Sequence, residues 1–95
     1  MKAIATFQTE HANRYLATLC KHFSHKVAVT YDDQGGHVDF PFGQCGLMAE
    51  SGHLTLTATA SDAAHLDTVT EVITRHLERF AFRENPRIDW QRCTT

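Results

Sequence analysis

Two things are missing from this sequence: a long apolar run and a large excess of charge of either sign. Its 95 residues include nine Lys and Arg against eleven Asp and Glu, a formal net charge of -2 with histidine neutral. A membrane helix needs about 20 consecutive apolar residues, and a nucleic-acid-binding surface is usually rich in Lys and Arg. The first residues also lack the apolar segment of an export signal. We therefore expect a cytoplasmic protein that binds neither membranes nor nucleic acid.

Cysteine is scarce as well, and the three cysteines form no CxxC pair. An odd number of cysteines without an export signal argues against a disulfide framework and favours free thiols in a reducing compartment. No glycine-rich phosphate loop follows a strand-like segment, so the common kinds of nucleotide binding receive no support.

What is present is ordinary globular composition, with 42% hydrophobic and 21% charged residues in a chain of the size of one domain. We therefore expect a single α+β domain over residues 1–95. A chain this short buries only about two-thirds of the surface that it exposes when unfolded, so a second copy would help to stabilise it. Homodimerisation therefore stays open as an alternative.

The spacing of the apolar residues predicts the order of the elements. Period-two alternation predicts strands over 2–8, 27–31, 37–42, Cys45 to Ala49, 53–60 and 87–92. Three- and four-residue spacing predicts helices over 11–23 and from Ser61 or Asp62 to about Arg79. The order β-α-β-β-β-β-α-β favours an antiparallel β-sheet with two helices packed on one face.

Three details of these elements can be predicted from single residues. Thr9 is expected to cap the first helix, because a threonine hydroxyl can accept a hydrogen bond from a free backbone N–H. Gly43 is expected to start a turn after the third strand. Ile88 and Trp90 are expected to point inward from the last strand.

The residues most suggestive of chemistry surround the end of the first predicted helix. Cys20, His22 and His25 lie close together in the sequence, and Cys45 comes from a later strand. Two thiolates and two imidazoles would suit zinc or iron, so these four residues form a candidate metal site. However, Cys20 and His22 are about 200° apart around a helix, so they bind one ion only if the helix ends between them.

The two cysteines also have a structural explanation. Cys20 falls within the apolar stripe of the first helix, and Cys45 alternates with Leu47 and Ala49, as buried thiols do. The alternative is a nucleophile or redox group activated by a nearby histidine, which requires an accessible thiolate. No acid that would orient such a histidine can be identified.

The histidines have a structural explanation too. His22 and His25 are expected on the polar face of the first helix, where histidines are usually solvated, although such a face can bind an anion or a metal. His76 lies on the apolar face of the second helix, where a hydrogen-bonded core histidine is the usual role.

Three segments carry a resemblance to a known family: RYLATLCKHFSHKVAV (14–29), DFPFGQCGLMAE (39–50) and HLERFAFREN (76–85). Over residues 3–92 the chain resembles short bacterial proteins of unknown function that occur alone or joined to siderophore-interacting flavin reductases. Because those reductases act on ferric siderophores in the cytoplasm, the resemblance implies a role in iron acquisition. The residues that match the family wording are Cys20, Lys21, His22, His25, Lys26, Phe42, Gly43 and Cys45.

Three functions are compatible with these observations. The first is a binding module that uses the end of the first helix and the turn after Phe42 to bind iron, a ferric siderophore or the reductase itself. Its ligand-binding residues would be Lys21, His22, His25, Lys26, Phe42 and Gly43. The second is an interaction domain, such as a homodimer formed by pairing of exposed strand edges. The third is a redox or metal-dependent enzyme that uses Cys20 or Cys45, with iron or zinc as its cofactor.

Overall fold

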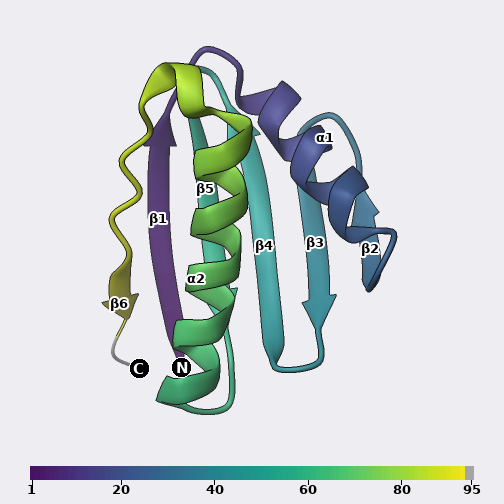
Figure 1. Ribbon diagram of the computed structural model, residues 1–95, viewed down its shortest axis with the longest axis vertical. Coiled ribbons are helices and arrows are strands. Elements are labelled where there is room, and N and C mark those ends of the chain that lie inside the picture. Colours follow the sequence, from purple (N-terminus) through teal and green to yellow (C-terminus); the bar gives the residue numbers. More distant parts are fainter. Residues whose placement is uncertain (94–95) are drawn as a thin grey trace.

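One six-stranded antiparallel sheet, covered on one face by two helices, makes up this computed structural model, which describes residues 1–93 (Figure 1). Its strands are β1 (Lys2–Gln8), β2 (Ala28–Tyr31), β3 (Gly35–Phe40), β4 (Gly43–Glu50), β5 (His53–Thr59) and β6 (Gln91–Cys93). Its helices are α1 (Ala12–Phe23), α2 (Ala63–Phe80) and the short 3-10 helix η1 (Phe82–Glu84). The predicted fold class and element order are therefore confirmed.

The strands lie side by side in the order β2-β3-β4-β5-β1-β6, and every neighbouring pair is antiparallel. Consecutive strands from β2 to β5 are joined by short turns, which antiparallel pairing allows. β1 then enters between β5 and β6, with Ala5 opposite Leu56. The two edges of the sheet are β2 and β6 (Figure 1).

The core lies between this sheet and the two helices. Alternate residues of the strands point toward the helices, as Val38, Cys45 and Leu56 do with no exposed surface. Leu16 of α1 and Ile73 of α2 meet them from the other layer, and both are also fully buried. Figure 1 shows that α1 crosses the β2 to β4 side while α2 runs over β5. The apolar stripes read from the sequence therefore face the sheet, as predicted.

Two local predictions about turns were wrong. Thr9 does not cap α1, which begins at Ala12; its hydroxyl instead accepts a hydrogen bond of 3.0 Å from the backbone N–H of His11. Gly43 is the first residue of β4, and the turn consists of the two residues before it. A Cβ at Gly43 would lie 2.6 Å from the carbonyl oxygen of Thr59 and 2.7 Å from Cγ2 of Val69, so this close approach requires glycine.

The last strand is shorter than predicted and spans only Gln91–Cys93. The side chains of Ile88 and Trp90 nevertheless pack inward against the core, as expected. The indole N–H of Trp90 donates a hydrogen bond of 2.7 Å to the hydroxyl of Thr74 on α2. Residues 87–90 are therefore held by contacts with α2 rather than by the hydrogen bonds of a strand ladder. Among the described residues, no helix is both long enough and apolar enough to span a bilayer.

Candidate functional site

The end of α1 lies against α2, and the contact is made by two histidines. The ring centroid of His22 is 4.8 Å from that of His76 and 5.6 Å from that of Phe80. His22 is half-buried by this contact, whereas the sequence predicted a solvated polar face. The sequence pattern of α1 could not predict the burial of His22, because α2 causes this burial by covering the side of α1 next to its apolar stripe.

His76 is held in one orientation by its own helix. Its Nδ1 lies 2.7 Å from the carbonyl oxygen of Val72, one turn earlier, and a carbonyl can only accept, so Nδ1 donates the proton. The predicted hydrogen-bonded histidine is therefore confirmed. Its Nε2 is left as the atom that can gain a proton. The ring of His76 also contacts that of Phe23, with centroids 4.8 Å apart.

Only positive charge is gathered around His22. Burial is the main cause that lowers the pKa of His22 below its ordinary value, and repulsion from His76, Lys26, His25 and Arg79 lowers it further. Within residues 1–93, neither Lys26 nor Arg79 forms an ion pair with a carboxylate. We call this group the cationic corner; its members are His22, His25, Lys26, His76 and Arg79. Converging cations without a carboxylate partner are well suited to hold an anion.

The remaining basic residue of the predicted set, Lys21, is an exposed residue of the last turn of α1. α1 ends at Phe23, and the Ser24 hydroxyl after it donates a hydrogen bond of 2.7 Å to the carbonyl oxygen of Lys21. His25 and Lys26 therefore lie in the connection to β2 and are both exposed. Of the sequence-predicted residues, His22, His25 and Lys26 are brought together with two residues of α2.

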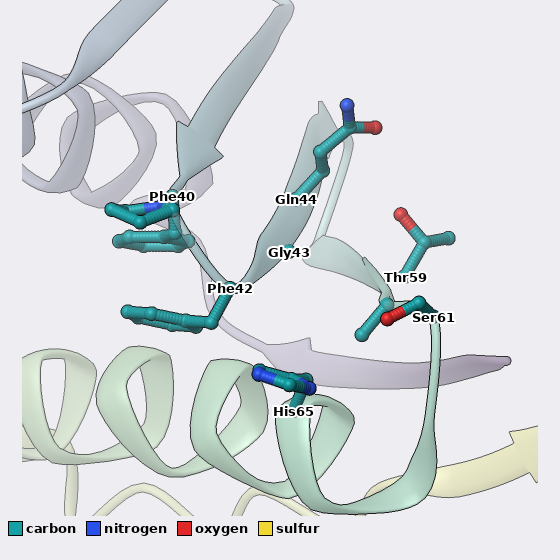
Figure 2. A pocket seen from close by; sticks show the side chains of 9 residues that line it. Phe40, Phe42, Gly43, Gln44, Thr59, Ser61 and His65 are labelled. Carbon is teal, nitrogen blue, oxygen red and sulfur yellow. The ribbon is translucent and has the colours of Figure 1, made fainter.

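A continuous row of rings leads from the cationic corner to the turn between β3 and β4. The ring of Phe23 contacts Phe40 at 5.1 Å between centroids, and Phe40 in turn stacks on Phe42 at 5.1 Å with an interplanar angle of 9°. Figure 2 shows these stacked rings, with Phe42 between Phe40 and α2. We call His76, Phe23, Phe40 and Phe42 the aromatic row. Phe42 and Gly43 therefore lie at its far end, away from His22.

An open hollow of about 550 Å³ borders that far end (Figure 2). Phe42, Gly43 and Thr59 line it together with His65 of α2. Nδ1 of His65 lies 2.8 Å from both carboxylate oxygens of Asp62, which also accepts a hydrogen bond from the His65 backbone N–H as the N-cap of α2. Asp62, the N-cap of α2, and His65 are therefore paired with each other.

The predicted metal site is not assembled in the structure. Cys20 and Cys45 are fully buried, and burial raises the pKa of Cys20 to about 11 and that of Cys45 to about 12. Cys20 packs so closely against β3 that a Cβ at Gly36 would lie 2.7 Å from its sulfur. Over residues 1–93, no three or more His, Cys, Asp or Glu side chains are arranged to hold a metal ion. These buried thiols do not fit a nucleophile, because a nucleophile needs an accessible thiolate.

The N-terminal half of α1 differs from the cationic corner, because its polar contact joins a donor and an acceptor. The Tyr15 hydroxyl donates a short hydrogen bond to the carboxylate of Glu84 in η1. This bond is the main cause that lowers the pKa of Glu84 and raises that of Tyr15. The carboxylate at this end therefore has its partner within the fold, and the contact ties α1 to the segment after α2.

Sequence reasoning missed the part of the site that α2 contributes. His76 was read as a core residue, and Arg79, one turn further along, was read only as the end of the helix. The one available signal was that basic residues end both helices, at Lys21 and His22 in α1 and at Arg79 in α2. The packing that joins these two helix ends depends on contacts between distant parts of the chain.

The fold and this surface define a small α+β domain with a one-sided sheet and a basic, aromatic-lined edge between its two helices. The chain belongs to the family DUF2218, described as an uncharacterized protein conserved in bacteria, whose model matches residues 4–91. It is similar to the NMR structure of PA4090 from Pseudomonas aeruginosa, at 32% identity and a TM-score of 0.83, covering 99% of this chain and 98% of that one. No curated protein matches the chain. The predicted membership in a bacterial family of unknown function is thus confirmed.

Proposed function

We propose that this domain is a small binding module that holds an anionic, aromatic ligand at the cationic corner. The single observation that carries the proposal is the absence, within residues 1–93, of any carboxylate paired with Lys26 or Arg79, although both add, after burial, to the lowering of the pKa of the half-buried His22. A fold gains nothing from bringing like charges together, because their repulsion destabilises it. A bound anion would turn that repulsion into attraction.

The aromatic ring beside His22 indicates which anions fit best. The ring of half-buried Phe80 lies 5.6 Å from that of His22, so an aromatic carboxylate or catecholate could stack on Phe80 while its oxygens meet Lys26 and Arg79. Catecholate siderophores belong to this chemical class, which agrees with the implied link to siderophore-interacting reductases. Iron would then enter as part of the ligand, held by the siderophore's own oxygens rather than by Cys20, Cys45 or the histidines.

Calorimetric titration with dihydroxybenzoate, free and as its ferric complex, tests this function. We expect the wild-type chain to bind at least one of the two, and the Lys26→Ala, Arg79→Ala double variant to bind at least about tenfold more weakly, since each charged hydrogen bond contributes about 1.5–3 kcal/mol. Arg75→Ala is the matched control, because this exposed arginine of α2 is paired with Glu71 at 2.6 Å. Wild-type protein without heat for either probe, or equal affinity in the double variant, would contradict the proposal.

The reductase named by the resemblance is a different kind of partner for the same corner. It is favoured only if the chain binds a siderophore-interacting reductase in the absence of any siderophore and binds neither probe above. The loss of that binding in the Lys26→Ala, Arg79→Ala variant would then place the reductase, rather than a small anion, at the cationic corner.

A further inference from the structure

One whole face of the sheet is left uncovered by the described elements, since both helices lie on the other face (Figure 1). Strand alternation sends every second side chain to this open face. In the three central strands these outward residues are Lys2, Ile4, Thr6, Gln8, Gln44, Gly46, Met48, Glu50, His53, Thr55, Thr57 and Thr59. Small and uncharged residues predominate among them.

Charge on the open face is confined to its two ends. The strand registers align Asp39, Gln44, Thr59 and Lys2 in one row across β3, β4, β5 and β1. At the opposite end, Glu50 of β4 is aligned with His53 of β5, and the two side chains lie 3.4 Å apart. Between these rows the open face has no carboxylate, lysine or arginine. His37 of β3 is aligned with Gly46 there and lies 3.1 Å from the carboxylate of Asp39, and Met48 is more than half exposed.

This pattern is self-complementary under a two-fold rotation. Consider a two-fold axis that lies between the two open faces, runs parallel to the strands and passes between β4 and β5. Rotation about this axis places β3 opposite β1 of the second copy and β4 opposite its β5. Each row of aligned residues keeps its position along the strands. Asp39 would then face Lys2 of the second copy, and Glu50 would face His53 of the second copy. Packed sheets cross at about 30°, an offset that the long Lys2 side chain can span. A two-fold interface forms each of these pairs twice.

The size of the face is adequate for such an interface. Six strands of three to eight residues, about 4.8 Å apart and at about 3.4 Å per residue, give a face of roughly 550 Å². Two such faces bury roughly 1,100 Å² in total, just above the roughly 1,000 Å² expected of a specific interface. The estimate agrees with the two longer dimensions of the molecule, 32 and 26 Å.

We propose that the open face is the surface through which two copies of this chain associate, face to face, as a two-fold dimer. Charge complementarity selects a second copy as the occupant, because Lys2 and Asp39 on one face match Asp39 and Lys2 on the other. The cationic corner lies on the helical side, so it stays accessible in the dimer. The inference is therefore independent of the proposed binding function.

Sedimentation equilibrium of the full chain tests the dimer directly. We expect a dimer for the wild type and a monomer for Thr57→Arg, which places a charge at the uncharged centre of the face. Thr68→Arg, on the solvent side of α2, is the matched control and should remain dimeric. Circular dichroism of both variants shows whether they are folded. A wild-type monomer at all concentrations, or a dimer that persists in folded Thr57→Arg, would overturn the proposal; the latter would indicate pairing through the β2 edge.

A charge exchange tests the orientation of the two copies. Lys2→Asp and Asp39→Lys should each raise the dimer dissociation constant by about three- to tenfold, since each puts like charges opposite each other at two places. The double variant should return the constant to near the wild-type value. If the double variant is as weak as the two single changes combined, the face-to-face arrangement in this register is wrong.

Discussion

The two halves of α1 differ in how their polar groups are satisfied. In the N-terminal half, Tyr15 donates to Glu84, and donor and acceptor are both satisfied inside the fold. In the C-terminal half, burial lowers the pKa of His22, and repulsion from His76, Lys26, His25 and Arg79 lowers it further. The comparison teaches that residue type alone does not mark a candidate site. A group of like charges that the fold itself leaves unsatisfied is the more informative signal.

The largest effect on stability is expected at the satisfied end. Tyr15→Phe removes the donor and leaves the half-buried Glu84 carboxylate without its partner, which should lower the free energy of unfolding by about 1–3 kcal/mol. Urea denaturation measures this change. Tyr31→Phe is the matched control, because Tyr31 is an exposed tyrosine of the edge strand β2 and should change stability by less than about 0.5 kcal/mol. Equal effects of the two changes would remove the distinction between the two halves of α1.

The pH dependence of stability should also separate the two ends. The pKa of His22 is lowered in the folded chain, so the unfolded chain binds a proton more readily. Above the ordinary pKa of 6.5, His22 is neutral in the folded and the unfolded chain and does not reduce stability. As the pH falls from 6.5 through the lower pKa of the folded chain, stability is lost. Glu84 also has a lowered pKa, so its contribution is complete above 4.5 and is lost only as the pH falls further.

Thermal unfolding at a series of pH values, for wild type and His22→Gln, measures the first of these losses. We expect the wild type to lose more stability than His22→Gln between neutral pH and about pH 5. Arg75→Gln is the control and should lose stability as the wild type does, because Arg75 is an exposed residue of α2 that is paired with Glu71. If His22→Gln loses stability as steeply as the wild type, neither burial nor repulsion within the cationic corner disfavours the charged form of His22.

The smallest effect is expected on the titration of His22 itself. Arg79→Gln removes one of the cations that lower the pKa of His22, so this pKa should rise by a fraction of a unit. NMR titration of the imidazole resonances measures it, and Arg75→Gln should leave it unchanged. An unchanged pKa in Arg79→Gln would show that Arg79 does not belong to the cationic corner.

The sequence was sufficient for the fold class because the patterns that define strands and helices are local. Thr55, Thr57 and Thr59 alternate with buried leucine and alanine, and this pattern alone predicts β5 and its two faces. Cys20 could be assigned to the core for the same reason, since it falls in the stripe of α1. The sheet order could not be predicted, because it depends on which distant strands pair, as β1 does with β5.

The candidate site was only partly accessible to sequence reasoning. His22, His25 and Lys26 were found because they are close together along the chain. His76 and Arg79 were not, since they join the site only through the packing of α2 against the end of α1. Phe42 was expected beside the end of α1, but it lies at the far end of the aromatic row rather than beside His22.

The most direct test of the anion-binding role of the cationic corner is an NMR titration of the wild-type chain with dihydroxybenzoate. We predict that the amide resonances of His22, His25, Lys26 and Arg79 shift most, and that the pKa of His22 rises when the ligand is bound, because an anion favours its charged form. Shifts confined to the hollow beside His65, or a His22 pKa that does not change on saturation, would contradict it.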